Sequence, residues 1–166
     1  MSIFVLDSNF FIEAHRVTYP LDVAHSFWNK VLQLAHEERI ISIDKVKDEI
    51  WEQKDALKDW CENYLPQGFF KDTTGVIQQY SQVIGWANAQ AGHYTAGAIA
   101  EFMEAEVADA FLIAFAYADS GEGIIVTHEV SAPQKISKIR IPDVCQPFGV
   151  RYCNTVDMFR ILGETF

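Results

Sequence analysis

The sequence predicts an α/β fold, a three-layer α/β/α sandwich whose parallel central sheet has about five short strands. Short apolar runs alternate along the chain with longer segments of helical periodicity, the pattern of a parallel sheet covered by helices on both faces. The first run, Ile3–Leu6, is apolar at four consecutive positions, as expected of a buried central strand. We find no internal repeat and no interdomain linker, so we expect one domain over residues 1–166.

Each predicted strand is a short run bounded by polar or turn-forming residues. Val, Ile, Phe and Tyr are frequent in these runs, and such side chains fit a pleated, buried surface. A turn at residues 120–123 leads the chain into the fourth strand. The five runs cover residues 3–6, 39–43, 68–71, 124–126 and 149–152.

Between the strands, apolar residues recur at helical spacing and polar residues mark the helix starts. Pro20 is placed to begin a helix that runs to about residue 36, and Asp44 is placed to cap the next one. Asn154 and Thr155 precede the last helix in the same way. We expect a short helix or loop at residues 10–15 and helices at 20–36, 45–54, 55–64, 75–91, 107–118 and 155–162.

Two stretches are predicted to be irregular. Residues 91–97 contain two glycines and small side chains, which predicts a mobile loop. Residues 130–148 contain three prolines, and a loop of this length in a compact domain is usually functional or ordered by a partner.

Composition limits the compartments and partners that we consider. The chain has 13 basic and 23 acidic residues, which argues against non-specific duplex binding but leaves room for a local basic patch or a basic partner. No apolar stretch is long enough to span a membrane, and the N-terminal residues lack the features of a signal peptide. Three widely spaced cysteines favour free thiols in a cytoplasmic protein, although a metal or redox pair of Cys145 and Cys153 stays open.

Acidic side chains follow two of the predicted strands directly. Asp7 ends the first strand, and Glu129 lies just beyond the strand at residues 124–126, after Thr127 and His128. Sites in open α/β sheets gather beyond the carboxyl ends of strands. The simpler interpretation of residues 127–129 is a solvated loop.

Two further carboxylates belong to helices. Asp109 stands in the apolar helix at residues 107–118, where an unpaired carboxylate costs several kcal/mol. Glu49 borders the apolar face of the helix after the second strand. Asp109 could instead cap backbone amides, and Glu49 could be a solvated charge. Together with Asp7 and Glu129 they would repel one another unless a hard cation such as Mg²⁺ or Mn²⁺ neutralised them.

At these residues the chain resembles the PIN domain, the metal-dependent nuclease fold of the VapC-type toxins. Leu6-Asp7-Ser8-Asn9 resembles its opening Asp-x-Asn motif, and Glu49 matches the acid on the helix after the second strand. Asp109-Ala110 matches the third acidic motif, and Val126-Thr127-x-Glu129 resembles the strand-terminal Thr-x-Asp. The segment 138–148, with Ile141-Pro142-Asp143-Val144-Cys145, resembles a PIN-like bacterial family described only as a domain of unknown function.

The resemblance implies a ribonuclease that uses Mg²⁺ or Mn²⁺ to hydrolyse RNA phosphodiester bonds. Asp7, Glu49, Asp109 and Glu129 would hold the metal, and Asn9 and Thr127 would orient an acid or a water of the site, with a turn residue as the alternative for Asn9. Glu129 differs from the family, where Asp is usual. Residues 130–151 carry four basic side chains and one acid, so Lys135, Lys138 and Arg140 are candidates for binding the substrate backbone, with a solvated loop as the alternative.

The resemblance also implies partners. We expect the toxin of a toxin–antitoxin pair, a small and basic antitoxin, and a homodimer. A degenerate PIN-like module that binds RNA or protein without hydrolysis is the main alternative. A Mg²⁺-dependent phosphatase is a third, although we find no nucleophile motif with a matching lysine.

Overall fold

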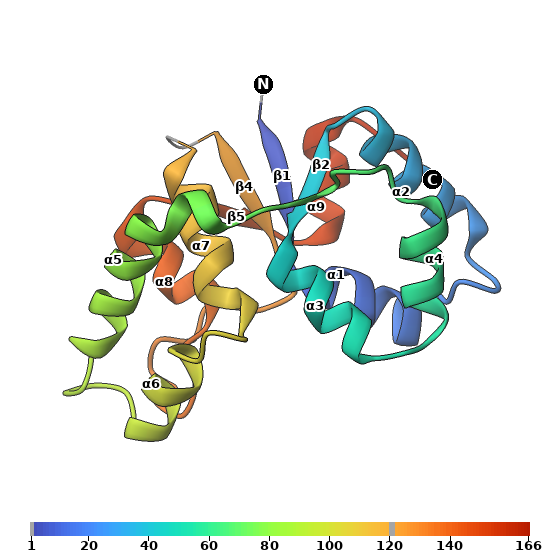
Figure 1. Cartoon of the computed structure of the whole chain (residues 1–166). Helices are drawn as coiled ribbons and strands as arrows, with labels where there is room; N and C mark the ends of the chain where they lie inside the picture. The colour runs from blue at the N-terminus through green and yellow to red at the C-terminus, as the bar shows by residue number, and fades with distance from the viewer. Residues whose placement is uncertain (1, 120–121) are drawn as a thin grey trace.

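The centre of the fold is a five-stranded, all-parallel sheet with the strand order β3-β2-β1-β4-β5 (Figure 1). The structure is a computed structural model that describes residues 2–119 and 122–166. The strands are β1 (Ile3–Leu6), β2 (Ile40–Ile43), β3 (Phe70–Lys71), β4 (Gly123–Val126) and β5 (Arg151–Cys153). The predicted α/β class with a parallel sheet of short strands is confirmed.

The three inner strands are buried because they consist almost wholly of apolar residues. All four residues of β2 and of β4 are buried, as are the last three of β1. In the register of the sheet, Leu6 of β1 pairs with Val126 of β4. The residues that follow, Asp7 and Thr127, therefore leave the sheet at the same level of its carboxyl edge.

Helices cover both faces of the sheet, so the sandwich has three layers (Figure 1). Helices α5, α7 and α8 gather on one side, and α1, α2, α4 and α9 lie on the other. The helices are α1 (Ser8–Glu13), α2 (His25–His36), α3 (Asp44–Glu52), α4 (Ala56–Tyr64), α5 (Ile77–Asn88), α6 (Ala96–Phe102), α7 (Ala108–Ala118), α8 (Ile141–Phe148) and α9 (Thr155–Leu162). A π-helical turn η1 (Ala14–Thr18) extends α1, and a 3-10 turn η2 (Thr74–Val76) precedes α5.

The long irregular stretch predicted at residues 130–148 is wrong in its second part, which forms α8. Pro142 lies in the first turn of α8, where a missing N–H costs no intrahelical hydrogen bond. Pro147 lies in the last turn, and Gly149 ends the helix in the left-handed region at φ 65°. The prolines therefore mark the two ends of a helix.

The loop predicted at residues 91–97 also ends earlier than expected. Thr95 accepts a hydrogen bond from the backbone N–H of Ala98, and α6 begins at Ala96. Its small residues let Ala98, Ile99 and Phe102 pack into the core.

Other boundaries shift by a few residues. The helix predicted from Pro20 begins only at His25, because residues 21–23 form a turn. Asp44 is the first residue of α3, and its carboxylate accepts hydrogen bonds from the backbone N–H of Lys45 and from Thr73. Asp55 and Asn154 cap α4 and α9. The turn predicted at 120–123 includes residues 120 and 121, which lie outside the described residues.

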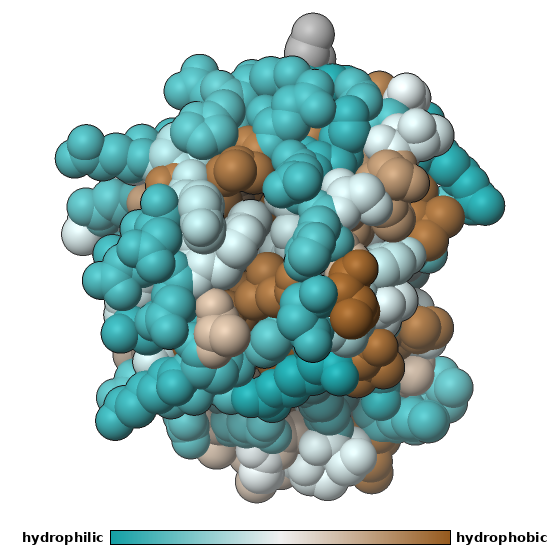
Figure 2. All heavy atoms as spheres, turned by 90° about the vertical axis from the view of Figure 1, so that its right-hand side faces the viewer, coloured by the Kyte–Doolittle hydropathy of each residue, from teal (hydrophilic) through white to brown (hydrophobic). Residues whose placement is uncertain are grey.

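None of the described helices is both long and apolar enough to cross a membrane. The face formed on the α2 and α4 side is mainly hydrophilic, and hydrophilic side chains interrupt its apolar patches (Figure 2). Val17, Val23 and Ile161 are among the exposed apolar side chains of the described residues.

Candidate metal centre

Asp7 occupies the carboxyl end of the central strand and is buried, with 2% of its surface exposed. One carboxylate oxygen accepts the backbone N–H of Ser8 at 2.7 Å, which caps α1. The other oxygen accepts the hydroxyl of Thr127 at 3.0 Å, from the loop after β4. The pairing of β1 with β4 thus places these two polar side chains together, as the sequence predicted for strand ends.

Glu49 reaches Asp7 through Ser8. The Ser8 hydroxyl donates to Glu49 Oε2 at 2.6 Å and lies 3.4 Å from Asp7 Oδ1. Glu49 Oε1 accepts the backbone N–H of Ala108 at 2.9 Å, so this carboxylate caps α7 from a neighbouring helix. Glu49 is therefore a partly buried, fully hydrogen-bonded acid and not the solvated charge that its position in α3 also allowed.

Asp109 lies in the first turn of α7, one residue after the amide that Glu49 caps. Among the described residues, no donor forms a hydrogen bond with its carboxylate, so it is not the backbone cap that the sequence also allowed. It lines a small cavity of about 50 Å³ together with Glu101 and Lys138. A cavity of this size has room for an ion or a water molecule.

Glu129 is held on both of its oxygens. Lys138 Nζ donates to Oε1 at 3.0 Å, and the backbone N–H of Ile141, at the start of α8, donates to Oε2 at 2.8 Å. Its side chain is only 13% exposed. Glu129 thus caps α8 just as Glu49 caps α7, and each of these helices lacks a cap from its own preceding residue.

The acids lie near enough for their charges to raise the pKa values of the two aspartates. Burial, followed by the charges of Glu129 and Glu49, raises the pKa of Asp7 from 3.8 to about 7, although the hydrogen bonds from Thr127 and Ser8 oppose this. Burial, followed by the charges of Asp7, Glu129 and Glu49, raises the pKa of Asp109 well above its usual value. Each of the two aspartates therefore resists ionisation in the folded protein.

The donor set fits a hard divalent cation in its chemistry. Carboxylate oxygens are the ligands that Mg²⁺ and Mn²⁺ prefer, and Asp109 offers a carboxylate without a competing donor beside a small cavity. Within residues 2–119 and 122–166, however, no three His, Cys, Asp or Glu side chains are arranged to hold an ion as they stand. The carboxylates of Glu49 and Glu129 instead accept hydrogen bonds from helix amides.

The three basic residues predicted to bind the substrate backbone occupy different environments. Asp7, Glu49, Asp109 and Glu129 together form what we call the acidic cluster. Lys138 contacts this cluster through its ion pair with Glu129. Partial burial alone would lower the pKa of Lys138, but the hydrogen bond and the charge of Glu129 raise it. Lys135 is exposed and pairs with no described residue, and Arg140 precedes α8 with a buried Nε that has no described acceptor.

Asn9 and Thr127 connect the ends of β1 and β4. Asn9 Nδ2 lies 3.4 Å from the hydroxyl oxygen of Thr127, and Asn9 Oδ1 accepts the backbone N–H of His128 at 3.2 Å. The Thr127 oxygen also accepts the N–H of Glu129. These bonds fix the segment 127–129 against α1.

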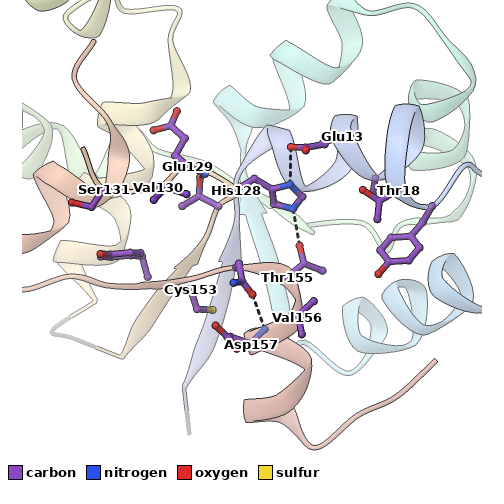
Figure 3. Close-up of a pocket in the computed structure, with 15 residues that line it drawn as sticks. Glu13, Thr18, His128, Glu129, Val130, Ser131, Cys153, Thr155, Val156 and Asp157 are labelled. Atoms are coloured by element: carbon purple, nitrogen blue, oxygen red, sulfur yellow. Dashed lines mark hydrogen bonds and ion pairs between the residues drawn. The ribbon is translucent and has the colours of Figure 1, made fainter. Parts of the chain in front are cut away.

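On the other side of this segment lies an open groove of about 630 Å³ between η1, the loop after β4 and the start of α9. The His128 ring points into it, whereas Glu129 points away (Figure 3). The ring donates from Nδ1 to the carboxylate of Glu13 at 2.7 Å, and Nε2 lies 2.9 Å from the hydroxyl of Thr155. Successive side chains of an extended segment point to opposite sides, so His128 faces the groove and Glu129 faces the other acids.

Two roles were not predicted from the sequence. Ser8 links Asp7 to Glu49, and the only hint was its place inside the Asp7-Ser8-Asn9 motif. Glu101 joins Asp109 and Lys138 at the small cavity, although no motif marks it.

The cysteines do not form a site of their own. All three are free thiols, and burial raises the pKa of Cys145 to about 12 and that of Cys153 to about 11. Such thiols are poor nucleophiles and poor metal ligands at neutral pH.

Comparison with known proteins assigns the chain to a family. No curated protein and no solved structure matched the sequence. The family described as "Domain of unknown function (DUF4411)" matches residues 4–166, which includes all four acids and every element from β1 to α9 except the first residue of β1, Ile3. The chain therefore belongs to the DUF4411 family.

Proposed function

We propose that this DUF4411 protein is a metal-dependent endoribonuclease that hydrolyses RNA phosphodiester bonds. The observation that carries the proposal is the pair of buried or partly buried aspartates at the carboxyl edge of the sheet, whose pKa values are raised by burial and by the neighbouring acids. Such an arrangement destabilises the protein at neutral pH, and a bound divalent cation would relieve the repulsion; strongly shifted pKa values of this kind are common at functional sites.

Asp7, Glu49, Asp109 and Glu129 are the residues that could hold the ion. When bound, Mg²⁺ or Mn²⁺ lowers the pKa of water and neutralises charge on a phosphodiester. Thr127 and Ser8 orient the Asp7 carboxylate, and Asn9 fixes the backbone that carries Glu129. Lys138 offers a positive charge beside the cluster for the phosphate backbone of the substrate.

Cleavage of a labelled single-stranded RNA in the presence of Mn²⁺ or Mg²⁺ tests the proposal. We expect cleavage by the wild type, its loss on chelation, and a decrease of about 100-fold or more in D109N. D119N is the matched control, because Asp119 follows the same helix α7 at its exposed end. Cleavage by D109N at the wild-type rate, with the metal requirement unchanged, would remove Asp109 from the mechanism.

A second candidate function is a binding module that keeps the fold without hydrolysis. The capping of α7 by Glu49 and of α8 by Glu129 favours it, since these bonds give both glutamates a structural role. Calorimetric titration with Mn²⁺ separates the two candidates. The nuclease should bind the ion and lose it in D109N, whereas the binding module should show no saturable uptake.

The assignment of the protein as a PIN-like toxin with an antitoxin partner is also a proposal. The order of Asp7, Glu49, Asp109 and Glu129 along a parallel α/β fold supports a PIN-like domain, and the net charge of −10 would suit a basic antitoxin. A toxin role predicts that expression of the active protein arrests growth, and that a small basic protein encoded next to it relieves the arrest. A homodimer remains part of this proposal and is tested by sedimentation.

A further inference from the structure

Lys138 differs from the other basic residues of its segment because it contacts the acidic cluster. Its ammonium group lies 3.0 Å from Glu129 Oε1 and lines the small cavity beside Asp109. Both Lys138, whose side chain is 45% exposed, and Lys135, three residues earlier, reach the surface, but the ammonium group of Lys135 has no described partner. A lysine that only attracted RNA from the surface would not need to face the acids in this way.

Both carboxylate oxygens of Glu129 already accept a hydrogen bond in this arrangement. Lys138 occupies Oε1, and the backbone N–H of Ile141 occupies Oε2 at 2.8 Å. Its carboxylate is largely buried, and an ammonium ion and a helix amide together compensate its charge. Asp109, in contrast, has no described hydrogen-bond donor.

We propose that Lys138 supplies the positive charge that a second divalent ion would otherwise supply at Glu129. The site then holds one divalent ion, which the acids near Asp7 and Asp109 bind, away from the pair of Glu129 and Lys138. Two of the three N–H groups of the ammonium remain available for a phosphate oxygen of the substrate. This inference rests on the proposed nuclease function, and it deepens that function by setting the number of ions and naming the residue that replaces one.

The charge of Lys138 has opposite consequences for the two ligands. A unit positive charge close to the ion repels it, so its removal should strengthen metal binding. The same charge attracts the phosphate, so its removal should weaken cleavage. A variant that merely damaged the fold would weaken both.

Calorimetric titration with Mn²⁺ at pH 7.5 tests the inference. We expect one ion per chain in the wild type. K138M should bind Mn²⁺ at least about fivefold more tightly, while its cleavage of single-stranded RNA falls at least about tenfold. K138R, which keeps the charge, and K135M, which removes a charge from the same segment, should bind Mn²⁺ within about twofold of the wild type.

Thermal unfolding establishes that the variants fold, and K138Q replaces K138M should the latter be unstable. Two ions in the wild type, or K138M with unchanged Mn²⁺ affinity, would overturn the role of Lys138 and leave the nuclease proposal intact. No saturable Mn²⁺ uptake by the wild type would overturn the nuclease proposal and this inference with it.

Discussion

A single residue of the candidate site, Asp7, lowers the free energy of unfolding at neutral pH. Its pKa is raised from 3.8 to about 7, first by burial and then by the charges of Glu129 and Glu49. Between these two pH values the folded protein keeps a proton that the unfolded chain has lost. The free energy of unfolding therefore falls as the pH rises from about 4 to about 7, and it levels off above that range.

The variant D7N should remove this cost. Asn keeps an acceptor for the N–H of Ser8 and cannot ionise. We expect a gain of about 2–4 kcal/mol in the free energy of unfolding at pH 8 and almost none at pH 4, measured by urea denaturation. D48N, which changes an exposed acid of α3, is the control and should stay within about 0.5 kcal/mol. A D7N protein that is less stable than the wild type at pH 8 would contradict this account.

Single residues also show how far the candidate site could be predicted. Asp7 and Glu129 were found because polar residues that follow buried strands lie at one edge of a parallel sheet. Ser8 and Glu101 were not, because their contacts depend on how α3 and α6 pack, and no local pattern encodes that packing. The bonds from Lys138 and Ile141 to Glu129 depend in the same way on the path of a loop.

Among the elements, α7 depends on a carboxylate that comes from α3. E49A leaves the N–H of Ala108 without its acceptor and removes the nearer acceptor of the Ser8 hydroxyl, whereas E49Q keeps a carbonyl oxygen and removes the charge. We expect E49A to be less stable than E49Q by about 1 kcal/mol in urea denaturation at pH 8. E52A and E52Q, at an exposed position of the same helix, should be indistinguishable. Equal stability of E49A and E49Q would show that the cap contributes nothing.

The end of α8 gives a second prediction at this scale. Gly149 has φ 65°, so G149A should cost about 1 kcal/mol even though the space around it is open. Gly85 lies exposed inside α5 with equally open space, so G85A should gain about 0.5–1 kcal/mol. Thermal unfolding of the two variants measures the loss of stability expected for G149A and the gain expected for G85A. A stabilised G149A would contradict the assignment of a left-handed helix end.

Elements were predicted well where apolar periodicity is strong and poorly where proline or small residues obscure it. The buried strands and the apolar helix α7 are examples of the first kind. The helix α8 was missed because proline was read as a loop signal, although Pro142 stands where a helix tolerates it. The short helix α6 was missed because its alanines and glycine give almost no hydrophobic pattern.

At the scale of the whole molecule, a ligand of the acidic cluster should stabilise the fold. If Mn²⁺ binds the folded state alone, a concentration of about 100 times Kd adds about 2.7 kcal/mol to the free energy of unfolding. The unfolding temperature should rise with Mn²⁺ and return on chelation, and D109N should not respond. D119N should respond as the wild type does. A rise that D109N shares would place the ion elsewhere on this acidic chain.

The sheet ends on both sides in very short strands, β3 with two residues and β5 with three. Lys71 and Arg151, one on each, add positive charge to these margins. Such margins give another chain little backbone to extend by strand pairing, which protects a concentrated solution from aggregation. Copies of the protein that associate must therefore meet through side chains on their helices and loops, and not by joining their sheets into one.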